Sequence, residues 1–310
     1  MKIIEKEIKI KDKNLIAQKS LLFDIETTGF SRTSARIYLI GSLAKENNKY
    51  IFRQYLTENS ADEKLILKEF LNLALSYDYL VSFNGDSFDL PFIKARCQRY
   101  GLDSSHLDAI ESIDLYKLIK EKALFVSLDN YKLKTIEKFM GLNREDLFTG
   151  GELISLYYEY ENGDKNLENI LLLHNEEDII NMPIVYEFLD FLDRENTIKL
   201  GDVNFLIEKI SLKKNKLEIT GRTSIDKAFL QGSAFKLSVE DKNFIFEHLV
   251  QEGLYKENST CSYVEKHDLD LVCNYKIASP EEIYLLKVDK KQLNLNIKTF
   301  FHKVLAGLME

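Results

Sequence analysis

The heptapeptide Phe23-Asp24-Ile25-Glu26-Thr27-Thr28-Gly29 ends an apolar run and constrains the fold more than any other stretch of the sequence. The run Leu21–Glu26 predicts a β-strand that ends in two carboxylates. Successive side chains of a strand point to opposite faces, so Asp24 and Glu26 project from the same face and can reach one metal ion. For this pair alone, a solvated strand end is the alternative.

Turn signals and hydrophobic periodicity around this stretch predict further strands and helices. A hairpin is expected from Arg36–Ala44 and Tyr50–Leu56, with Asn47-Asn48 as its turn. Tyr79–Phe83 predicts a short strand that ends at Asn84-Gly85. Helical spacing predicts helices over Asp62–Leu75, Phe88–Tyr100, Leu115–Lys122, Lys134–Met140, Glu152–Tyr160 and Leu167–Asp193. This order of elements favours an α/β domain in which helices flank a mixed sheet.

A second polar segment lies where the short strand ends and a helix begins, in Phe83-Asn84-Gly85-Asp86-Ser87-Phe88-Asp89. An acid at the start of a helix can cap it and interact favourably with its dipole, and this is the simplest interpretation of Asp89 alone. A capping or turn role is likewise the preferred interpretation of Asp86.

The third segment, His174-Asn175-Glu176-Glu177-Asp178, lies within a predicted helix. His174 and Asp178 are four residues apart and therefore share one helix face. A titratable base beside a carboxylate suits a proton acceptor next to a metal ligand. An exposed His–Asp pair is the alternative, and Glu176 and Glu177 are expected to face solvent.

The composition excludes several classes of protein. The 310 residues are 45% hydrophobic and 30% charged, which is typical of a globular fold, and 13 Gly and 3 Pro exclude a collagen-like or low-complexity chain. Lys and Arg number 42 against 50 Asp and Glu, so the net charge is −8. This charge excludes a strongly basic coat for nonspecific binding of nucleic acid, although a local basic groove is compatible with it.

Cysteine use and the lack of long apolar runs predict a cytoplasmic protein. Cys97, Cys261 and Cys273 form no Cys-x-x-Cys pair, which argues against a disulfide framework and against a Cys-rich zinc site. No apolar run reaches about 18 residues, so neither a membrane-spanning helix nor a membrane partner is expected. The charged residues 1–14 lack the apolar core of a secretory signal.

In combination, the three polar segments resemble the DEDD superfamily of 3′→5′ exonucleases, which has a ribonuclease H-like fold. FDIETTG is similar to the first motif of that superfamily, FNGDSFDLPF to the second and HNEED to the third. Residues Tyr131–Glu137 resemble the segment that precedes the third motif. The similarity is greatest to the bacterial ribonuclease H-like exonuclease family related to YprB and to the editing domains of family B DNA polymerases. It covers about residues 20–195.

The resemblance implies roles for individual residues. The implied metal-binding carboxylates are Asp24, Glu26, Asp89 and Asp178. These four acids and His174, in the place of the general base, are the implied catalytic residues. The implied substrate-binding residues are Thr27, Asn84 and Phe88, and core packing is the alternative for Phe88. The chain departs from the family at His174, because a His-x3-Asp spacing stands where the histidine branch has His-x4-Asp and the tyrosine branch has Tyr-x3-Asp.

The acids also indicate metal chemistry by themselves. Converging carboxylates raise one another's pKa values, and divalent cations relieve that repulsion. An all-oxygen ligand set suits two Mg²⁺ or Mn²⁺ ions, which can promote phosphodiester hydrolysis. With the resemblance, this predicts a 3′→5′ exonuclease that acts on DNA or RNA with a free 3′ end. The alternative is a catalytically silent nucleic-acid-binding or scaffolding protein on the same fold.

The sequence pattern changes near residues 196–202, from segments that predict helices to segments that predict strands. We expect a ribonuclease H-like exonuclease domain over residues 1–198 and a smaller β-rich or α+β accessory module over residues 199–310. Strands in the module are predicted over Phe205–Ser211, Lys216–Thr220, Asp270–Ile277 and Glu282–Val288. No motif assigns a function to this module, and recruitment of a protein partner is one hypothesis.

Overall fold

The chain divides into two compact units, which a computed structural model describes for residues 1–10, 19–266 and 269–309. Unit 1 comprises residues 1–120 and 128–189, and unit 2 comprises residues 121–127 and 190–310. Unit 2 thus includes a short segment from the first part of the chain, as well as residues 190–198. The division into domains over 1–198 and 199–310 stays a prediction.

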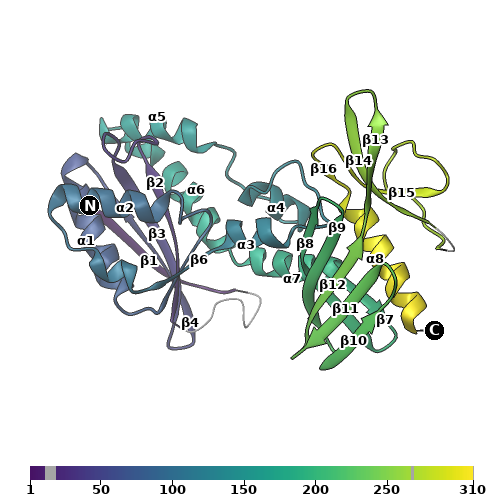
Figure 1. The fold of residues 1–310 in the computed structure, drawn as a ribbon. Helices are drawn as coiled ribbons and strands as arrows, with labels where there is room; N and C mark the ends of the chain where they lie inside the picture. The colour runs from purple at the N-terminus through teal and green to yellow at the C-terminus, as the bar shows by residue number, and fades with distance from the viewer. Residues whose placement is uncertain (11–18, 267–268, 310) are drawn as a thin grey trace. The chain divides into compact units, whose positions relative to one another are not determined.

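Unit 1 is built on a mixed six-stranded sheet with the strand order β1-β4-β3-β2-β5-β6 (Figure 1). Strands β2, β3 and β4 form an antiparallel meander, β1 is antiparallel to β4, and β5 and β6 continue the sheet in parallel with β2. The strands are β1 Lys2–Ile8, β2 Ser20–Thr27, β3 Ile37–Glu46, β4 Lys49–Leu56, β5 Tyr79–Ser82 and β6 Glu111–Asp114. The expected α/β class with a mixed sheet is confirmed.

Strand β2 sends alternate side chains to the two faces of this sheet. Leu21, Phe23 and Ile25 are buried in the core formed with α1 (Glu63–Ala74) and α2 (Asp89–Tyr100). Asp24 and Glu26 project from the opposite face, over which α6 (Glu168–Asn181) contacts β2, β3 and β4. The period of two in β2 therefore places both acids under α6.

The remaining helices of the first part of the chain are α3 Leu115–Lys122, α4 Leu133–Phe139, α5 Gly150–Glu161 and α7 Ile184–Asn196. The single helix expected over Leu167–Asp193 is wrong, because α6 ends at Asn181 and α7 begins at Ile184. Pro183 lies between them and has no backbone N–H to continue a helix. The Asn47-Asn48 turn is confirmed, and both residues have the positive φ angles, 47° and 64°, of a type I′ hairpin turn.

Two strands of unit 1 were not predicted. Strand β1 is rich in charged residues, as edge strands commonly are, and its Lys2 and Lys6 form ion pairs with Glu168 and Glu176 of α6. Strand β6 has only four residues, which is too short for a clear periodic pattern. Residues 11–14 of the charged N-terminal segment lie outside the described residues.

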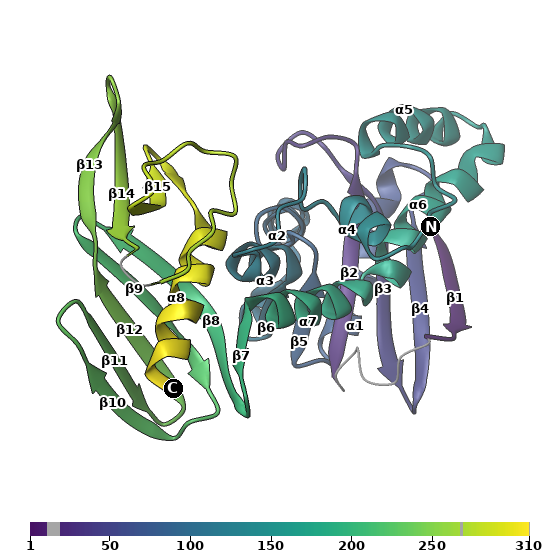
Figure 2. The ribbon, with the colours of Figure 1, turned by 90° about the vertical axis from the view of Figure 1, so that its right-hand side faces the viewer.

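Unit 2 is an α+β module with two antiparallel sheets (Figure 2). The six-stranded sheet has the order β10-β11-β12-β9-β8-β7, and the four-stranded sheet has the order β13-β14-β15-β16. The strands are β7 Thr197–Leu200, β8 Val203–Lys213, β9 Lys216–Thr223, β10 Lys227–Gln231, β11 Phe235–Glu240, β12 Asn243–Leu249, β13 Gln251–Lys256, β14 Ser259–Glu265, β15 Ile283–Val288 and β16 Lys291–Gln292. The β-rich or α+β character expected of this part is confirmed.

Helix α8 (Asn294–Met309) closes the core of unit 2, where Phe300 and Phe301 pack with Phe205 and Phe246. The strand predicted over Asp270–Ile277 is wrong, because no strand forms there. Asn274 instead donates its side-chain amide to Thr299 of α8 at 2.9 Å. Among the described helices, none combines the length and the hydropathy that crossing a bilayer requires.

Candidate active site

Carboxylates from three separate elements of unit 1 converge beneath α6. Asp24 and Glu26 come from β2, Asp89 from the first turn of α2, and Asp178 from α6. Burial and then the negative charges of Asp89, Glu26 and Asp178 raise the pKa of Asp24 well above its usual range. All four predicted metal ligands are therefore close enough to repel one another, although the chain separates them by up to 154 residues.

Asp89 is buried and faces β2 instead of capping its helix. Phe88 occupies the N-cap position and makes no side-chain cap, whereas Asp89 Oδ1 accepts a hydrogen bond from the backbone N–H of Ile25 at 3.1 Å. Burial raises the pKa of Asp89 to about 7, against the lowering effect of that hydrogen bond. Ile25 stands between Asp24 and Glu26, so this bond links the first acidic segment to the second.

Asn175 holds Asp24 in place from α6. Its Nδ2 donates to Asp24 Oδ2 at 3.1 Å, and its Oδ1 accepts a hydrogen bond from Gln54 Nε2 of β4, also at 3.1 Å. Gly41 is the partner of Asp24 across the β2–β3 pair. A Cβ atom at Gly41 would lie 2.0 Å from Asn175 Oδ1, so only glycine lets α6 approach β3 this closely.

Glu26 is a buried carboxylate that accepts no hydrogen bond from the described residues; the nearest ring nitrogen, His174 Nε2, is 3.7 Å from Glu26 Oε1. Burial and then the charges of Asp178, Asp89 and Asp146 raise its pKa well above the usual range. A buried acid without hydrogen-bond donors is costly unless a cation or a proton compensates it. Oxygen atoms arranged in this way fit a hard divalent cation.

His174 points into the carboxylate cluster. Its Nε2 lies 3.6 Å from Asp178 Oδ2, and single ligand atoms of Glu26, His174 and Asp178 all lie within 4.8 Å of one another. Its other ring nitrogen, Nδ1, forms a 2.6 Å contact with Asp146 Oδ2. A proton on Nδ1 leaves Nε2 as the acceptor that faces the acids. His174 at the shorter spacing therefore still reaches the cluster.

Asp146 is itself fixed by three neighbours. Lys134 Nζ lies 2.7 Å from its Oδ2, the backbone N–H of Phe148 donates to its Oδ1 at 2.9 Å, and Glu177 accepts a hydrogen bond from its backbone N–H at 2.9 Å. Burial by itself would raise the pKa of Asp146. The hydrogen bond from Lys134, followed by that from the backbone of Phe148, nevertheless keeps this pKa below its usual range. The expectation that Glu177 only faces solvent is wrong, because its carboxylate holds the loop that carries Asp146.

Arg144 supplies positive charge to the cluster from the same loop. Its Nη1 lies 2.5 Å from Asp178 Oδ1, and its Nε and Nη2 contact the carboxylate of Glu137. Glu137 is buried, and burial raises its pKa although the hydrogen bonds from Arg144 oppose that shift. One guanidinium thus bridges Glu137, a buried acid of α4, and Asp178, the partly buried acid of the third motif.

Of the three predicted substrate-binding residues, Thr27 ends β2, Asn84 follows β5, and Phe88 is the N-cap residue of α2. Thr27 Oγ1 donates to the carbonyl of Gly29 at 2.8 Å, and Asn84 has a φ of 69°, with its backbone N–H bonded to Asp114. Phe88 is partly buried and packs against the core, and its ring centroid lies 6.3 Å from that of Phe30. Phe30 is 85% exposed, so it is the more accessible aromatic surface.

Sequence reasoning missed the residues that orient the site, Asn175, Asp146 and Arg144. Gly41 was a signal for Asn175, since a glycine inside a branched, apolar strand indicates a close approach of another element. Asp146 and Arg144 lie between α4 and α5, where no periodicity connects them to His174 and Asp178.

Residues 21–190 match the sequence model of the RNase_H superfamily, which is more than half of the chain. The chain belongs to the RNase H superfamily. The resemblance carried by FDIETTG, FNGDSFDLPF and HNEED is thereby confirmed, and the match contains every candidate site residue named above. Membership of the RNase H superfamily supports a nuclease-type function, and an acidic cluster is the kind of site with which such nucleases bind divalent metals.

Individual relatives of this RNase H superfamily member include polymerases and a protein without an assigned activity. It is 25% identical over 236 residues to the PolC-type DNA polymerase III of Caldanaerobacter subterraneus subsp. tengcongensis, an alignment that covers 66% of this chain and 16% of the polymerase. It is 25% identical over 169 residues to the uncharacterized protein YprB of Bacillus subtilis, covering 53% of this chain and 40% of YprB.

A solved structure is also similar. The family B DNA polymerase from Pyrobaculum calidifontis aligns with a TM-score of 0.45 and 16% identity, over 56% of this chain and 24% of the polymerase. This chain therefore spans less than half the length of each of these relatives.

Proposed function

We propose that this protein is a metal-dependent 3′→5′ exonuclease that hydrolyses phosphodiester bonds of DNA or RNA. The observation that carries the proposal is the cluster of Asp24, Glu26, Asp89 and Asp178, into which His174 projects. Glu26 and Asp89 are buried, and Asp24 and Asp178 are partly buried. Four acids brought together from β2, α2 and α6 are costly to stability, which a catalytic role would explain. The RNase H superfamily and the polymerase relatives support the same class of chemistry.

The four carboxylates would hold two divalent cations, Mg²⁺ or Mn²⁺. When bound, these ions would supply Lewis acidity and positive charge for displacement at phosphorus. Asn175 would keep Asp24 oriented, and the backbone of Ile25 would do the same for Asp89. Thr27, Asn84 and Phe88, with the exposed ring of Phe30, would contact the terminal nucleotides.

His174 would act as the general base. Its Nδ1 contact with Asp146 directs the free electron pair of Nε2 toward the acids, where the attacking water would lie. Water would lose its proton to Nε2 while its oxygen forms the new bond to phosphorus. The bond from phosphorus to the 3′-oxygen of the preceding nucleotide would break, releasing the terminal nucleotide.

One contact favours a second function, nucleic-acid binding without catalysis. Arg144 compensates Asp178 at 2.5 Å, so one of the four acids already has a cationic partner. If that pair persisted in the presence of metal, the cluster would offer only three ligands. Calorimetric titration with Mn²⁺ separates the two functions, since an absence of metal binding would favour the silent protein.

The decisive experiment uses 5′-labelled single-stranded DNA and RNA with Mn²⁺, with Mg²⁺ or with EDTA. The wild type should shorten one or both strands from the 3′ end only when metal is present. Asp24→Asn, which keeps the size of the side chain, should abolish this ladder. Asp190→Asn, an exposed acid outside the cluster, serves as the matched control and should cleave like the wild type.

Unchanged cleavage by Asp24→Asn would exclude the proposed site. No cleavage by the folded wild type under either metal would favour the silent function, and a ladder from the 5′ end would exclude the proposed polarity. Comparison of the DNA and RNA arms identifies the substrate, because a contact to the 2′-hydroxyl is what distinguishes them.

A further inference from the structure

Unit 2 contains a cavity of about 340 Å³ between β7 and α8 whose polar lining is basic and neutral. Its polar lining residues are Lys199, Lys298, His302, Thr197, Thr299 and Asn274. In the described part of the chain, no Asp or Glu lines this cavity. Two ammonium groups without an acid are notable in a protein whose net charge is −8.

One face of α8 forms a wall of the cavity. Leu295, Lys298, Thr299 and His302 follow the i, i+3, i+4, i+7 spacing, which aligns their side chains along the helix. The opposite wall is Thr197–Lys199 of β7, in which Ile198 is buried in the core of unit 2. Both walls are thus regular elements anchored in the core, so packing fixes the backbone positions that carry the basic side chains.

Lys298 is the basic group that most requires a counter-ion. Its Nζ donates to the backbone carbonyl of Glu195 and lies 5.0 Å from the centroid of the Phe125 ring. Burial lowers the pKa of Lys298, and the charge of Glu195 only partly opposes this shift. Among the described residues, no carboxylate forms an ion pair with it, and the side chains of Lys199 and His302 form no hydrogen bond or ion pair. A partly desolvated cation whose partners are a neutral carbonyl and an aromatic ring, with no carboxylate, favours a bound anion.

We propose that this cavity binds the phosphate group of a nucleotide. Phosphate offers several strong acceptor oxygens, which matches donors that surround the cavity from Lys199, Lys298 and the hydroxyl of Thr299. The volume lies at the small end of the range for small-molecule sites, so it accommodates more than a bare ion. The phosphate site stands on the cavity alone, whereas the choice of a nucleotide as its carrier rests on the proposed nuclease function.

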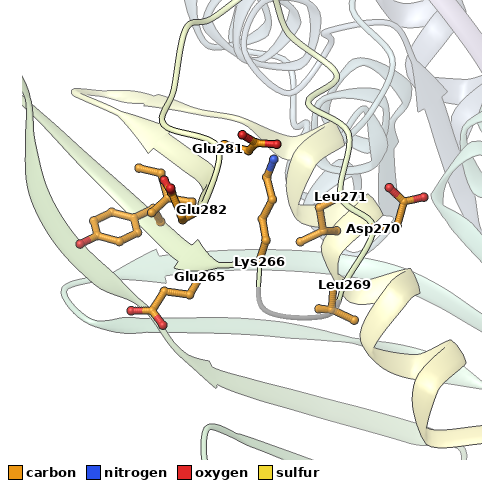
Figure 3. Close-up of a pocket in the computed structure, with 9 residues that line it drawn as sticks. Glu265, Lys266, Leu269, Asp270, Leu271, Glu281 and Glu282 are labelled. Carbon is orange, nitrogen blue, oxygen red and sulfur yellow. The ribbon is translucent and has the colours of Figure 1, made fainter.

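A second pocket of unit 2 has the opposite character. Glu265, Asp270, Glu281 and Glu282 line it together with Lys266, whose side chain points toward Glu281 (Figure 3). Unit 2 therefore does not attract anions over its whole surface, and the basic cavity is a local feature. The acidic pocket also supplies a control position, Glu281, for the following experiment.

The test is calorimetric titration of the full chain in EDTA with inorganic phosphate, with a nucleoside 5′-monophosphate and with a short single-stranded oligonucleotide. Lys298→Met removes the ammonium and keeps the apolar stem, and it should weaken binding of the phosphate-bearing probes by about tenfold or more. Lys199→Ala tests the same site at an exposed position, in case Lys298→Met does not fold. Lys303→Met on α8 and Glu281→Gln should bind like the wild type.

The probes distinguish the carriers. Tight binding of the monophosphate with weak binding of the oligonucleotide supports a free nucleotide, and comparable binding of both supports a strand. Asp24→Asn should retain all binding, because the cavity does not use the carboxylate cluster. Loss of binding in Asp24→Asn, equal affinities of the wild type and both lysine variants, or no binding of any probe by the wild type would each overturn the proposal. Phosphate binding through Lys298 in a protein without nuclease activity would refute the proposed function and keep the phosphate site.

Discussion

The Nδ1 atom of His174 contacts Asp146 Oδ2 at 2.6 Å, across 28 residues of sequence. This contact sets the direction of the ring, because Nδ1 is the only ring nitrogen of His174 with a partner at hydrogen-bond distance among the described residues. Asp146 in turn is held by Lys134 and by the loop that Glu177 supports. His174 is therefore oriented from outside the cluster that it enters.

We expect Asp146→Asn to lower kcat by about 10–100-fold with little change in KM, because it disturbs the ring and not the substrate contacts. The measurement is steady-state cleavage by the variant, by His174→Ala and by the double variant. His174→Ala should cost little in the Asp146→Asn background, because both changes remove the same function. Glu176→Gln, a neighbour on α6 that pairs with Lys6, is the control. Fully independent effects of the two substitutions would contradict the positioning role.

Gly41→Ala should disturb the site through packing. The added Cβ would meet Asn175 Oδ1 at 2.0 Å, so α6 must move away from β3 or Asn175 must release Asp24. We expect a loss of about 1–3 kcal/mol in the free energy of unfolding by urea and a loss of activity. Gly307→Ala in α8, where no atom lies within 4 Å of the new Cβ, should instead stabilise the chain by about 0.5–1 kcal/mol. Equal stability of the two variants would rule out the proposed steric limit.

The acid cluster predicts how the metal-free protein responds to pH. The pKa of Asp89 is about 7 in the folded protein against 3.8 for an ordinary Asp, so the folded state holds a proton that the unfolded chain has released. Its contribution to stability is complete below the unfolded pKa and is lost as the pH rises through about 7. The raised pKa values of Asp24 and Glu26 act in the same direction.

In EDTA, the melting temperature should therefore be a few degrees higher near about pH 5.5 than near about pH 8. Mn²⁺ should stabilise the protein more at the higher pH, because the carboxylates are then ionised and repel one another. Asp89→Asn should flatten the dependence in EDTA. A melting temperature that rises with pH over this interval would show that another set of groups controls stability.

Phe30 offers a test of substrate contact that is separate from folding. Its ring is 85% exposed and meets Phe88 edge-on, so removing it should change the free energy of unfolding by no more than about 0.5 kcal/mol. If a terminal base stacks on it, Phe30→Ala should raise KM by about tenfold with a smaller effect on kcat. Leu147→Ala removes a side chain that is 87% exposed and is the matched control. An unchanged KM would place the terminal base elsewhere.

The features that could be predicted from sequence are those with a short period. Alternation along β2 placed Asp24 and Glu26 on one face, and the four-residue spacing placed His174 and Asp178 together on α6. Asp89 could be assigned to the site only from the three motifs taken together, because an acid at the start of a helix also suits a capping role. In these cases the local geometry of one element determines the direction of the side chain.

The residues that complete the site depend on contacts between elements. Asp146 and Arg144 act from a loop, and nothing in that loop indicates which helix it will meet. Strand β1 and most strands of unit 2 were missed because charged residues mask their alternation, as in KIIEKEI. The helix predicted across Pro183 is interrupted for a simpler reason: the apolar spacing continues through this position, but proline has no backbone N–H with which to continue the helix.

The Asn175–Asp24 bond closes a loop of 151 residues and has a consequence for the order of folding. During synthesis, β2 leaves the ribosome long before α6, and the bond cannot form until both are available. A nascent chain or an N-terminal fragment that ends before α6 lacks His174, Asn175 and Asp178. If the proposed function is correct, no chain that ends before α6 can assemble the site, however much of the sheet it has formed.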